Sequence, residues 1–306
     1  MRSRPFQQVD VFTAKPMRGN PLAVVLDGEG LSDTQMQAFA AWTQLSETTF
    51  VLPPSPEGRA QGADYRVRIF TPGGELPFAG HPTLGTAHAW LQAGGQPQAA
   101  DRLVQECGVG LVTLRQQDSR YAFAAPSLRR ATPDADKLAA VRDALGLAPD
   151  EVLAAQDLHN GPHWLGLLLP DVETVLSLTP DHAALKQLGV KVGVAARRQN
   201  APGLIRRASR EARAFSGHAA TQADTTDLEV RGFAAPVGIA EDPVTGSLNA
   251  SLAQWLIEGG HMPARYRARQ GTALGRAGEV FVHRDDAGQV WIGGDVVACI
   301  QGTVQL

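Results

Sequence analysis

Two apolar segments about half a chain apart share one pattern, and they constrain the fold of this 306-residue sequence most strongly. Residues 80–91 and 246–256 each end on a Trp-Leu pair, and a Gly-Gly pair follows each, at residues 94–95 and 259–260. Neither segment contains Asp, Glu, Lys or Arg. A helix without a charged face is normally buried on all sides. The pattern therefore predicts one buried helix in each half of the chain.

Short β-rich segments surround both predicted helices. We expect strands at residues 8–13, 22–26, 48–52, 65–70, 111–114, 121–124, 164–169, 191–195, 227–233, 279–283, 289–292 and 296–304. Many short strands with few helices predict an α+β chain in which antiparallel sheet dominates. One buried helix in each half indicates two sheets, each wrapped round a central helix, that arose by internal duplication. The alternative is a pair of unrelated buried helices with similar ends.

Composition narrows the class of protein. The length suits two domains of about 150 residues each, and 43% hydrophobic against 19% charged residues provide for a packed core. The net charge is −3 and the charges form no basic stripe, so we expect no nucleic-acid partner. Residues 1–10 are polar and no apolar run approaches the roughly 18 residues of a membrane helix. We therefore expect no signal peptide, no membrane partner and a cytoplasmic location.

Both predicted helices begin with residues that suit an anion site. The first begins at Gly80-His81, and the second begins at Gly246-Ser247, shortly after Asp242. Glycine lets a ligand approach the backbone, and the free N–H groups of a helix start attract anions. If the halves pack face to face, both starts face one crevice that favours a carboxylate-bearing substrate. The alternative is ordinary capping of the second helix by Ser247 or Asp242.

Glu47 lies between a predicted amphipathic helix at residues 32–44 and the predicted strand at residues 48–52. A glutamate in such a turn is most simply an exposed carboxylate. At a half-buried junction its pKa can instead rise enough for general acid–base chemistry. The residues themselves leave both interpretations open.

The sequence does not favour a metal site, a nucleotide-binding site or a serine nucleophile. The histidines show no HxH or HExxH spacing, and the two cysteines form no CxxC pair, so we expect no metal site. No GxGxxG motif follows a strand and opens a helix, and neither a GxSxG elbow nor a Walker A motif is present. Cys107 and Cys299 are expected to be small buried apolar residues.

Several ordered motifs resemble the PhzF-like isomerase family of phenazine biosynthesis. They are, in chain order, GNP at residues 19–21, LSETTF at 45–50, RIFTP at 68–72, ELPFAGHP at 75–82, HNGP at 159–162 and EDPVTGS at 241–247. They follow the order of the family and cover the chain from near residue 6 to its end. The resemblance implies a diaminopimelate-epimerase-like fold, in which two similar domains, each an antiparallel β-barrel around a central helix, enclose a cleft. It also implies a homodimer.

The resemblance sets expected domain limits. We expect an N-terminal domain at residues 1–126 and a C-terminal domain at residues 127–293. The last strand, within residues 294–306, is expected to return to the first domain, as it does in this fold. Residues 198–226 are polar and irregular, and we expect them to form a surface excursion.

The resemblance also assigns roles to residues. Glu47 is the implied acid–base residue, and His81 and Asp242 assist it through hydrogen bonds. The implied substrate-binding residues are Gly80, His81, Asp242, Gly246 and Ser247. All of these positions match the motifs of the family.

The implied reaction is an isomerisation that needs no metal and no organic cofactor. A proton moves between carbons of a small carboxylate, such as a dihydro-hydroxyanthranilate, in which a hydrogen passes from C3 to C1. One alternative is a one-base epimerase or racemase of an amino acid-like substrate. Another is a non-catalytic relative that binds a small molecule. Two-thiol racemase chemistry is disfavoured, because neither helix start carries a cysteine.

Overall fold

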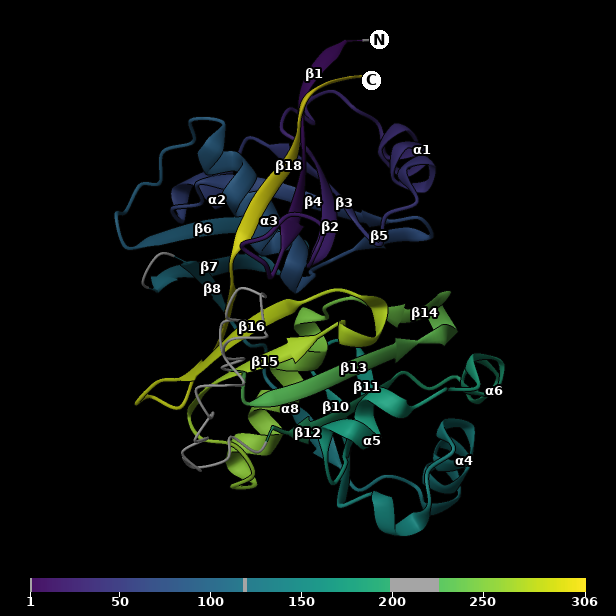
Figure 1. The fold of residues 1–306 in the computed structure, drawn as a ribbon. Helices are drawn as coiled ribbons and strands as arrows, with labels where there is room; N and C mark the ends of the chain where they lie inside the picture. The colour runs from purple at the N-terminus through teal and green to yellow at the C-terminus, as the bar shows by residue number, and fades with distance from the viewer. Residues whose placement is uncertain (1, 118–119, 199–225) are drawn as a thin grey trace, which may run out of the picture.

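The computed structural model describes residues 2–117, 120–198 and 226–306 (Figure 1). The excursion expected at residues 198–226 lies almost wholly outside the described residues. The strands of the first half are β1 (Ser3–Val11), β2 (Asn20–Val25), β3 (Thr48–Leu52), β4 (Tyr65–Thr71), β5 (Gly74–Leu76), β6 (Arg102–Cys107), β7 (Gly110–Gln117) and β8 (Arg120–Ala124). Those of the second half are β9 (Arg129–Ala131), β10 (Ala154–His159), β11 (His163–Leu168), β12 (Val192–Arg197), β13 (Leu228–Ala234), β14 (Ile239–Asp242), β15 (Arg265–Gln270), β16 (Gly278–Arg284), β17 (Val290–Gly294) and β18 (Val296–Gln305).

Helices are interspersed with these strands. They are α1 (Asp33–Thr43), α2 (Pro56–Ala60), α3 (Gly80–Gln92), α4 (Ala135–Leu145), α5 (Val172–Ser177), α6 (His182–Leu188) and α8 (Gly246–Glu258), with short 3-10 turns η1 (Pro149–Glu151), η2 (Ala235–Val237) and η3 (Thr272–Leu274). The α+β class expected from the sequence is confirmed. Helix α1 begins with a capping box between Ser32 and Gln35.

The two halves repeat the same succession of strand pairings. In the first half β1–β2 is antiparallel, β2–β3 parallel, β3–β4 antiparallel, β4–β6 parallel, and β6–β7 and β7–β8 antiparallel. In the second half β10–β11, β11–β12, β12–β13, β13–β15, β15–β16 and β16–β17 follow the same order of senses. The hairpin strands β5 and β14 add to β4 and β13, and a central helix follows each of them. The repeat supports the internal duplication.

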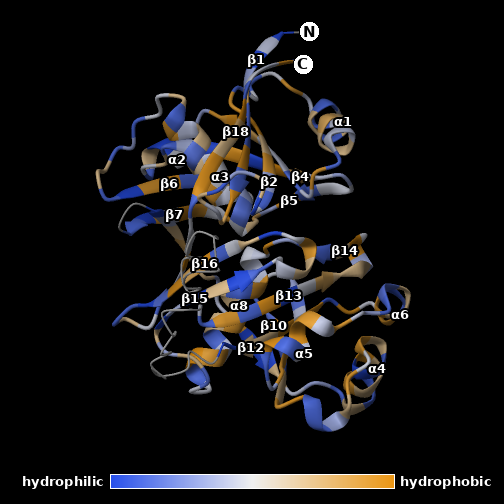
Figure 2. Ribbon diagram, viewed as in Figure 1, coloured by the Kyte–Doolittle hydropathy of each residue, from blue (hydrophilic) through white to orange (hydrophobic). Residues whose placement is uncertain are grey.

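The central helices α3 and α8 are the two charge-free segments of the sequence, and both are largely buried. Figure 1 shows α3 among the strands of the first half and α8 among those of the second, while Figure 2 shows hydrophobic residues recurring along the strands of both. Small residues allow the close packing. A Cβ at Gly85 of α3 would lie 2.6 Å from a methyl carbon of Leu22, and one at Gly193 of β12 would lie 2.2 Å from a methyl carbon of Leu248.

Strands also pass between the halves. Strand β18, the last strand of the second half in sequence, pairs antiparallel with β1 along its length, and β8 pairs antiparallel with β17. The expected domain limits, 1–126 and 127–293, stay a prediction. Among the described residues, no helix is long and apolar enough to cross a membrane.

Some local expectations are wrong. Cys299 is exposed because it lies on β18, where most residues are in solvent, and Cys107 at the end of β6 is only partly buried. Several elements were not predicted from the sequence. These are β5, β6, β9, β10, β14, β15 and the helices α2, α4, α5 and α6.

Replacing Gly85 by Ala tests the packing of α3. The new methyl group would meet Leu22 at 2.6 Å and Val11 at 2.9 Å, and both side chains are fully buried. Overpacking outweighs the gain in helix propensity, so the free energy of unfolding in urea is expected to fall by about 1–2 kcal/mol. Gly302→Ala, where the methyl group meets no atom within 4 Å, is the control. Wild-type stability of Gly85→Ala would contradict this packing.

Candidate active site

The N-termini of α3 and α8 meet at two glycines. A Cβ at Gly246 would lie 3.2 Å from the Cα atom of Gly80 and 3.3 Å from the backbone nitrogen of His81. A side chain at either position would therefore push the two helix starts apart. The sequence places a glycine first in each helix, and the fold uses both glycines at this contact.

Neither helix start is capped by a side chain. The N-cap residues are Ala79 and Thr245, and neither donates or accepts a capping hydrogen bond. The predicted capping of α8 by Ser247 or Asp242 is therefore wrong. Thr245 is the N-cap residue, Ser247 lies inside the first turn, and no side chain caps the helix. Backbone N–H groups in the first turn of a helix lack helical acceptors, and the helix dipole adds partial positive charge. Two such starts in contact form a region suited to a carboxylate.

The Glu47 side chain also lies in this region, close to His81. Helix α1 ends where Gln44 takes a left-handed conformation with φ of 56°, and the chain then turns into β3. Glu47 directly precedes β3, which pairs with both β2 and β4. Its side chain is only 15% exposed. The buried interpretation of Glu47 therefore holds, and the exposed turn carboxylate is wrong.

Glu47 and His81 face each other without a hydrogen bond. The distance from Glu47 Oε2 to His81 Nε2 is 3.4 Å, and within the described part of the chain both atoms are buried and unpartnered. The other ring nitrogen of His81 bonds to the backbone of Pro21. Proline has no N–H group, so Nδ1 must donate to its carbonyl oxygen. In the neutral ring, Nε2 is therefore an acceptor directed at Glu47.

Asp242 completes the cluster from the end of β14. Its Oδ1 accepts a hydrogen bond from Asn20 Nδ2 at 3.0 Å, and its Oδ2 accepts one from the Thr245 hydroxyl at 2.6 Å. Charges on Glu47 and His81 act on its pKa. Asn20 also donates to the carbonyl oxygen of Val244 at 2.9 Å, so it ties the first half to the approach of α8.

Burial shifts the ionisation of all three groups. It raises the pKa of Glu47 to about 7, against a hydrogen bond from Ser46 that lowers it. Burial and repulsion by Glu47 raise the pKa of Asp242 to about 6. Burial lowers the pKa of His81 to about 4. Near neutral pH, His81 is uncharged and Asp242 is ionised, while Glu47 is close to its midpoint. Such a carboxyl is suited to gaining and losing a proton.

Among the described residues, no acceptor takes the hydroxyl proton of Ser247. The indole nitrogen of Trp164 donates to Ser247 Oγ at 3.3 Å, and Asn160 Nδ2 donates to the Ser247 carbonyl oxygen at 2.9 Å. An indole N–H only donates, so the Ser247 oxygen is the acceptor and its own proton points elsewhere. Ser247 thus adds a donor to the N–H groups at the start of α8.

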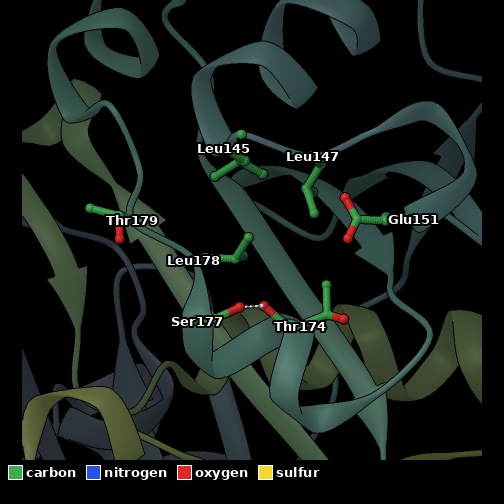
Figure 3. Close-up of a pocket in the computed structure, with 8 residues that line it drawn as sticks. Leu145, Leu147, Glu151, Thr174, Ser177, Leu178 and Thr179 are labelled. Atoms are coloured by element: carbon green, nitrogen blue, oxygen red, sulfur yellow. Dashed lines mark hydrogen bonds between the residues drawn. The ribbon is translucent and has the colours of Figure 1, made fainter.

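Two cavities lie away from this cluster. One of about 270 Å³ lies between α4, η1 and α5, where Leu145, Leu147 and Leu178 project toward one another (Figure 3). Another of about 150 Å³ is lined by His88, Arg120 and Asp295, among others. No predicted site residue lines either one. Across the described ranges, no three His, Cys, Asp or Glu side chains form a group that could hold a metal ion.

The structure brings the predicted site residues together. Glu47, His81 and Asp242 influence one another, Gly80 contacts Gly246, and Ser247 lies one residue further along α8. Several residues that hold these side chains in place have no role predicted from the sequence. These are Asn20, Trp164, Asn160, Thr245 and Gln270. Asn20 lies in the GNP motif, which contributed to the resemblance without a role for Asn20, and Gln270 lies in a strand that was not predicted at all.

Comparisons with known proteins agree with this arrangement. The family model of phenazine biosynthesis-like proteins, PhzC-PhzF, matches residues 9–302. Antisense-enhancing sequence 1 of Schizosaccharomyces pombe is 32% identical and aligns over 99% of both chains. Trans-2,3-dihydro-3-hydroxyanthranilate isomerase of Pseudomonas chlororaphis is 32% identical over 97% of this chain and 98% of its own. A PhzF-family phenazine biosynthesis protein of Bacillus anthracis has a TM-score of 0.80 at 21% identity over the whole of both chains, which shows the fold.

These matches show both the class of protein and its family. The chain has a duplicated α+β fold and relatives named as isomerases, and it is an isomerase. It belongs to the PhzC-PhzF family of phenazine biosynthesis-like proteins.

The raised pKa of Glu47 predicts a pH-dependent cost to stability. A carboxyl whose pKa is about 7 when folded and 4.5 in its ordinary state binds its proton more tightly in the folded protein. The stabilisation is present below pH 4.5 and is lost as the pH rises through 7. Between pH 5 and pH 8, the unfolding free energy of wild type is expected to fall by about 2 kcal/mol more than that of Glu47→Gln.

Urea unfolding at the two pH values measures this difference. Glu29→Gln, at an exposed position, is the control and is expected to follow wild type. If Glu47→Gln also follows wild type, the Glu47 carboxyl is not held in the protonated form by burial.

Proposed function

We propose that this enzyme moves a proton between two carbons of a small cyclic carboxylate, with Glu47 as the group that carries the proton and without a metal or organic cofactor. The observation that carries the proposal is the buried Glu47 carboxyl beside the acceptor nitrogen of neutral His81, 3.4 Å away. A raised pKa makes a carboxylate a stronger base, and a carboxyl that ionises near neutral pH can also return the proton.

The substrate carboxylate is held by the two helix starts in this proposal. The N–H groups of the first turns of α3 and α8, with the Ser247 hydroxyl, supply donors in a largely buried setting. Binding there places the ring of the substrate beside Glu47 and His81. The same donors stabilise negative charge that spreads toward the carboxylate when a neighbouring C–H bond is broken.

The chemistry then takes two steps. Ionised Glu47 removes a proton from one carbon, and the electron pair of that C–H bond enters the conjugated system of the substrate. The protonated Glu47 donates a hydrogen bond to His81 Nε2 while the system rearranges. The proton then passes from Glu47 to a second carbon, a double bond has moved, and no electron is gained or lost overall.

The substrate class comes from the relatives. Curated relatives are named trans-2,3-dihydro-3-hydroxyanthranilate isomerase, which describes a cyclic amino-hydroxy carboxylate. We propose a substrate of that kind, with a hydrogen that passes from C3 to C1. A homodimer and a cytoplasmic location are further proposals that rest on the resemblance alone.

Glu47→Gln is expected to stop turnover while substrate still binds. The amide keeps the shape of the side chain but cannot take up a proton, and loss of a general base lowers kcat by about 10²–10⁴-fold. The assay incubates protein and dihydro-hydroxyanthranilate in heavy water and follows, by NMR, the position of the double bond and any deuterium that enters a carbon of the substrate. Exposed Glu29→Gln is the control.

Three outcomes of the same assay decide the proposal. A shifted double bond that needs Glu47 supports it. Deuterium at one carbon with an unmoved double bond indicates an epimerase instead. Binding in wild type with neither a shifted double bond nor exchange indicates a non-catalytic relative and overturns the proposal.

Trp164→Phe tests the Ser247 donor. The ring remains, but the N–H that occupies Ser247 Oγ is lost, so the hydroxyl proton no longer has a fixed direction. Loss of one neutral hydrogen bond is expected to raise the KM of Trp164→Phe about fivefold, with a smaller change in kcat. Trp42→Phe, at a site that is 79% exposed, is the control. An unchanged KM would show that Ser247 does not bind the substrate.

A further inference from the structure

A buried amide organises the segment between Asp242 and α8. Gln270, on β15, is fully buried. Its Oε1 accepts hydrogen bonds from the Thr245 backbone N–H at 3.0 Å and from Asn249 Nδ2 at 2.8 Å. Its Nε2 lies 3.0 Å from both the Asp242 carbonyl oxygen and Thr245 Oγ1. Three of the four hydrogen bonds of the Gln270 amide therefore lead into this segment, and the fourth leads to Asn249 near the start of α8.

The partners of Gln270 fix which end of the amide is which. A backbone N–H is only a donor, so the atom that faces it must be the oxygen. A backbone carbonyl is only an acceptor, so the atom that faces Asp242 O must be the NH₂ group. The same NH₂ group therefore donates to the Thr245 hydroxyl oxygen.

The direction of the next hydrogen bond follows. Since Thr245 Oγ1 accepts from Gln270, its single proton is free for Asp242 Oδ2, which lies 2.6 Å away. Asn20 Nδ2 donates to the other oxygen, Asp242 Oδ1, at 3.0 Å. Both oxygens of Asp242 thus accept a hydrogen bond, and an ionised carboxylate suits two donors better than a carboxyl with its own proton.

We infer that Gln270 and Thr245 are positioning residues that keep Asp242 ionised, so that the proton shared by the two buried carboxyl groups stays on Glu47. The inference rests on the proposed function only for its consequence in catalysis. Two like charges close together in a buried site compete for one proton. Without a fixed direction of hydrogen bonding, Asp242 would take the proton that Glu47 has to carry. Ionised Asp242 also repels the charge of Glu47 and keeps it a stronger base.

Charged and titratable groups from several elements act on Asp242. Glu47 from the start of β3 raises its pKa, and His81 from α3 lowers it. The adjacent Glu241 is neutralised by Arg231 of β13, whose guanidinium forms two hydrogen bonds to that carboxylate at 3.0 and 2.8 Å. The charge of Asp10 raises the pKa of His81 and so affects Asp242 through His81. The donors from Thr245 and Asn20 oppose the effects of burial and of Glu47.

The order of titration in the wild-type protein is the first test. NMR of protein labelled with ¹³C in the carboxyl groups of Asp and Glu follows both groups, and Asp242→Asn and Glu47→Gln assign the signals. Asp242 is expected to titrate at lower pH than Glu47. The reverse order overturns the inference, whatever any variant shows.

Variants of the relay are the second test. Thr245→Val keeps the shape of the side chain and removes the hydroxyl, so the midpoint of Asp242 is expected to move to higher pH. Thr245→Ser keeps the hydroxyl and is expected to titrate like wild type. Gln270→Met removes the donor to Thr245 and is expected to shift Asp242 in the same direction as Thr245→Val. Midpoints that stay at the wild-type value in Thr245→Val and Gln270→Met overturn the inference.

Activity separates this inference from the proposed function. Thr245→Val loses a hydrogen bond to a charged group. Its kcat is therefore expected to fall about tenfold or more, with a smaller change in KM. Thr245→Ser is expected to restore kcat. If the titrations behave as expected but no variant changes the isomerisation, the relay stands and the proposed role of Glu47 fails.

Discussion

The contact between the starts of α3 and α8 is the constraint on which the site depends. A Cβ at Gly246 would lie 3.2 Å from the Cα atom of Gly80, so only two glycines allow this approach of the two backbones. The contact brings two uncapped helix starts to one place. It also places His81, the second residue of α3, opposite Glu47, and it brings Asp242 and its approach to α8 next to both. Everything that handles charge in the site follows from that approach.

Burial supplies the chemistry once the helices are in place. It acts in opposite directions on acids and bases, raising the pKa of Glu47 and Asp242 and lowering that of His81. Hydrogen bonds then separate the two carboxyl groups. Asp242 accepts from Asn20 and Thr245, while Oε2 of Glu47 is left without a partner among the described residues. Two similar side chains thereby acquire different roles.

Much of this arrangement could be predicted from local sequence. The charge-free helices predicted the two buried elements and the duplication, because burial on all sides excludes charged residues from every face. The helix starts at Gly80 and Gly246 suggested an anion site, and the motifs added Glu47, His81 and Asp242. These are features that act within a few residues of each other in the chain.

The rest depends on contacts between distant segments. Gln270 lies on β15 and reaches Thr245 only because β13 and β15 pair in parallel, and no local pattern marks it. Trp164 reaches Ser247 in the same way, from β11 to α8. Cys299 was expected to be buried because cysteine usually is, but the exposed position of β18 decides its environment.

The central claim is that one carboxyl, Glu47, carries the same proton from one carbon to the other. A dihydro-hydroxyanthranilate deuterated at C3 tests this most directly, in a single turnover in ordinary water with the product analysed by NMR. Because the same proton stays on the largely buried Glu47 carboxyl between the two carbons, the account predicts deuterium at C1 of the product. A product that carries only solvent hydrogen at C1 would contradict it.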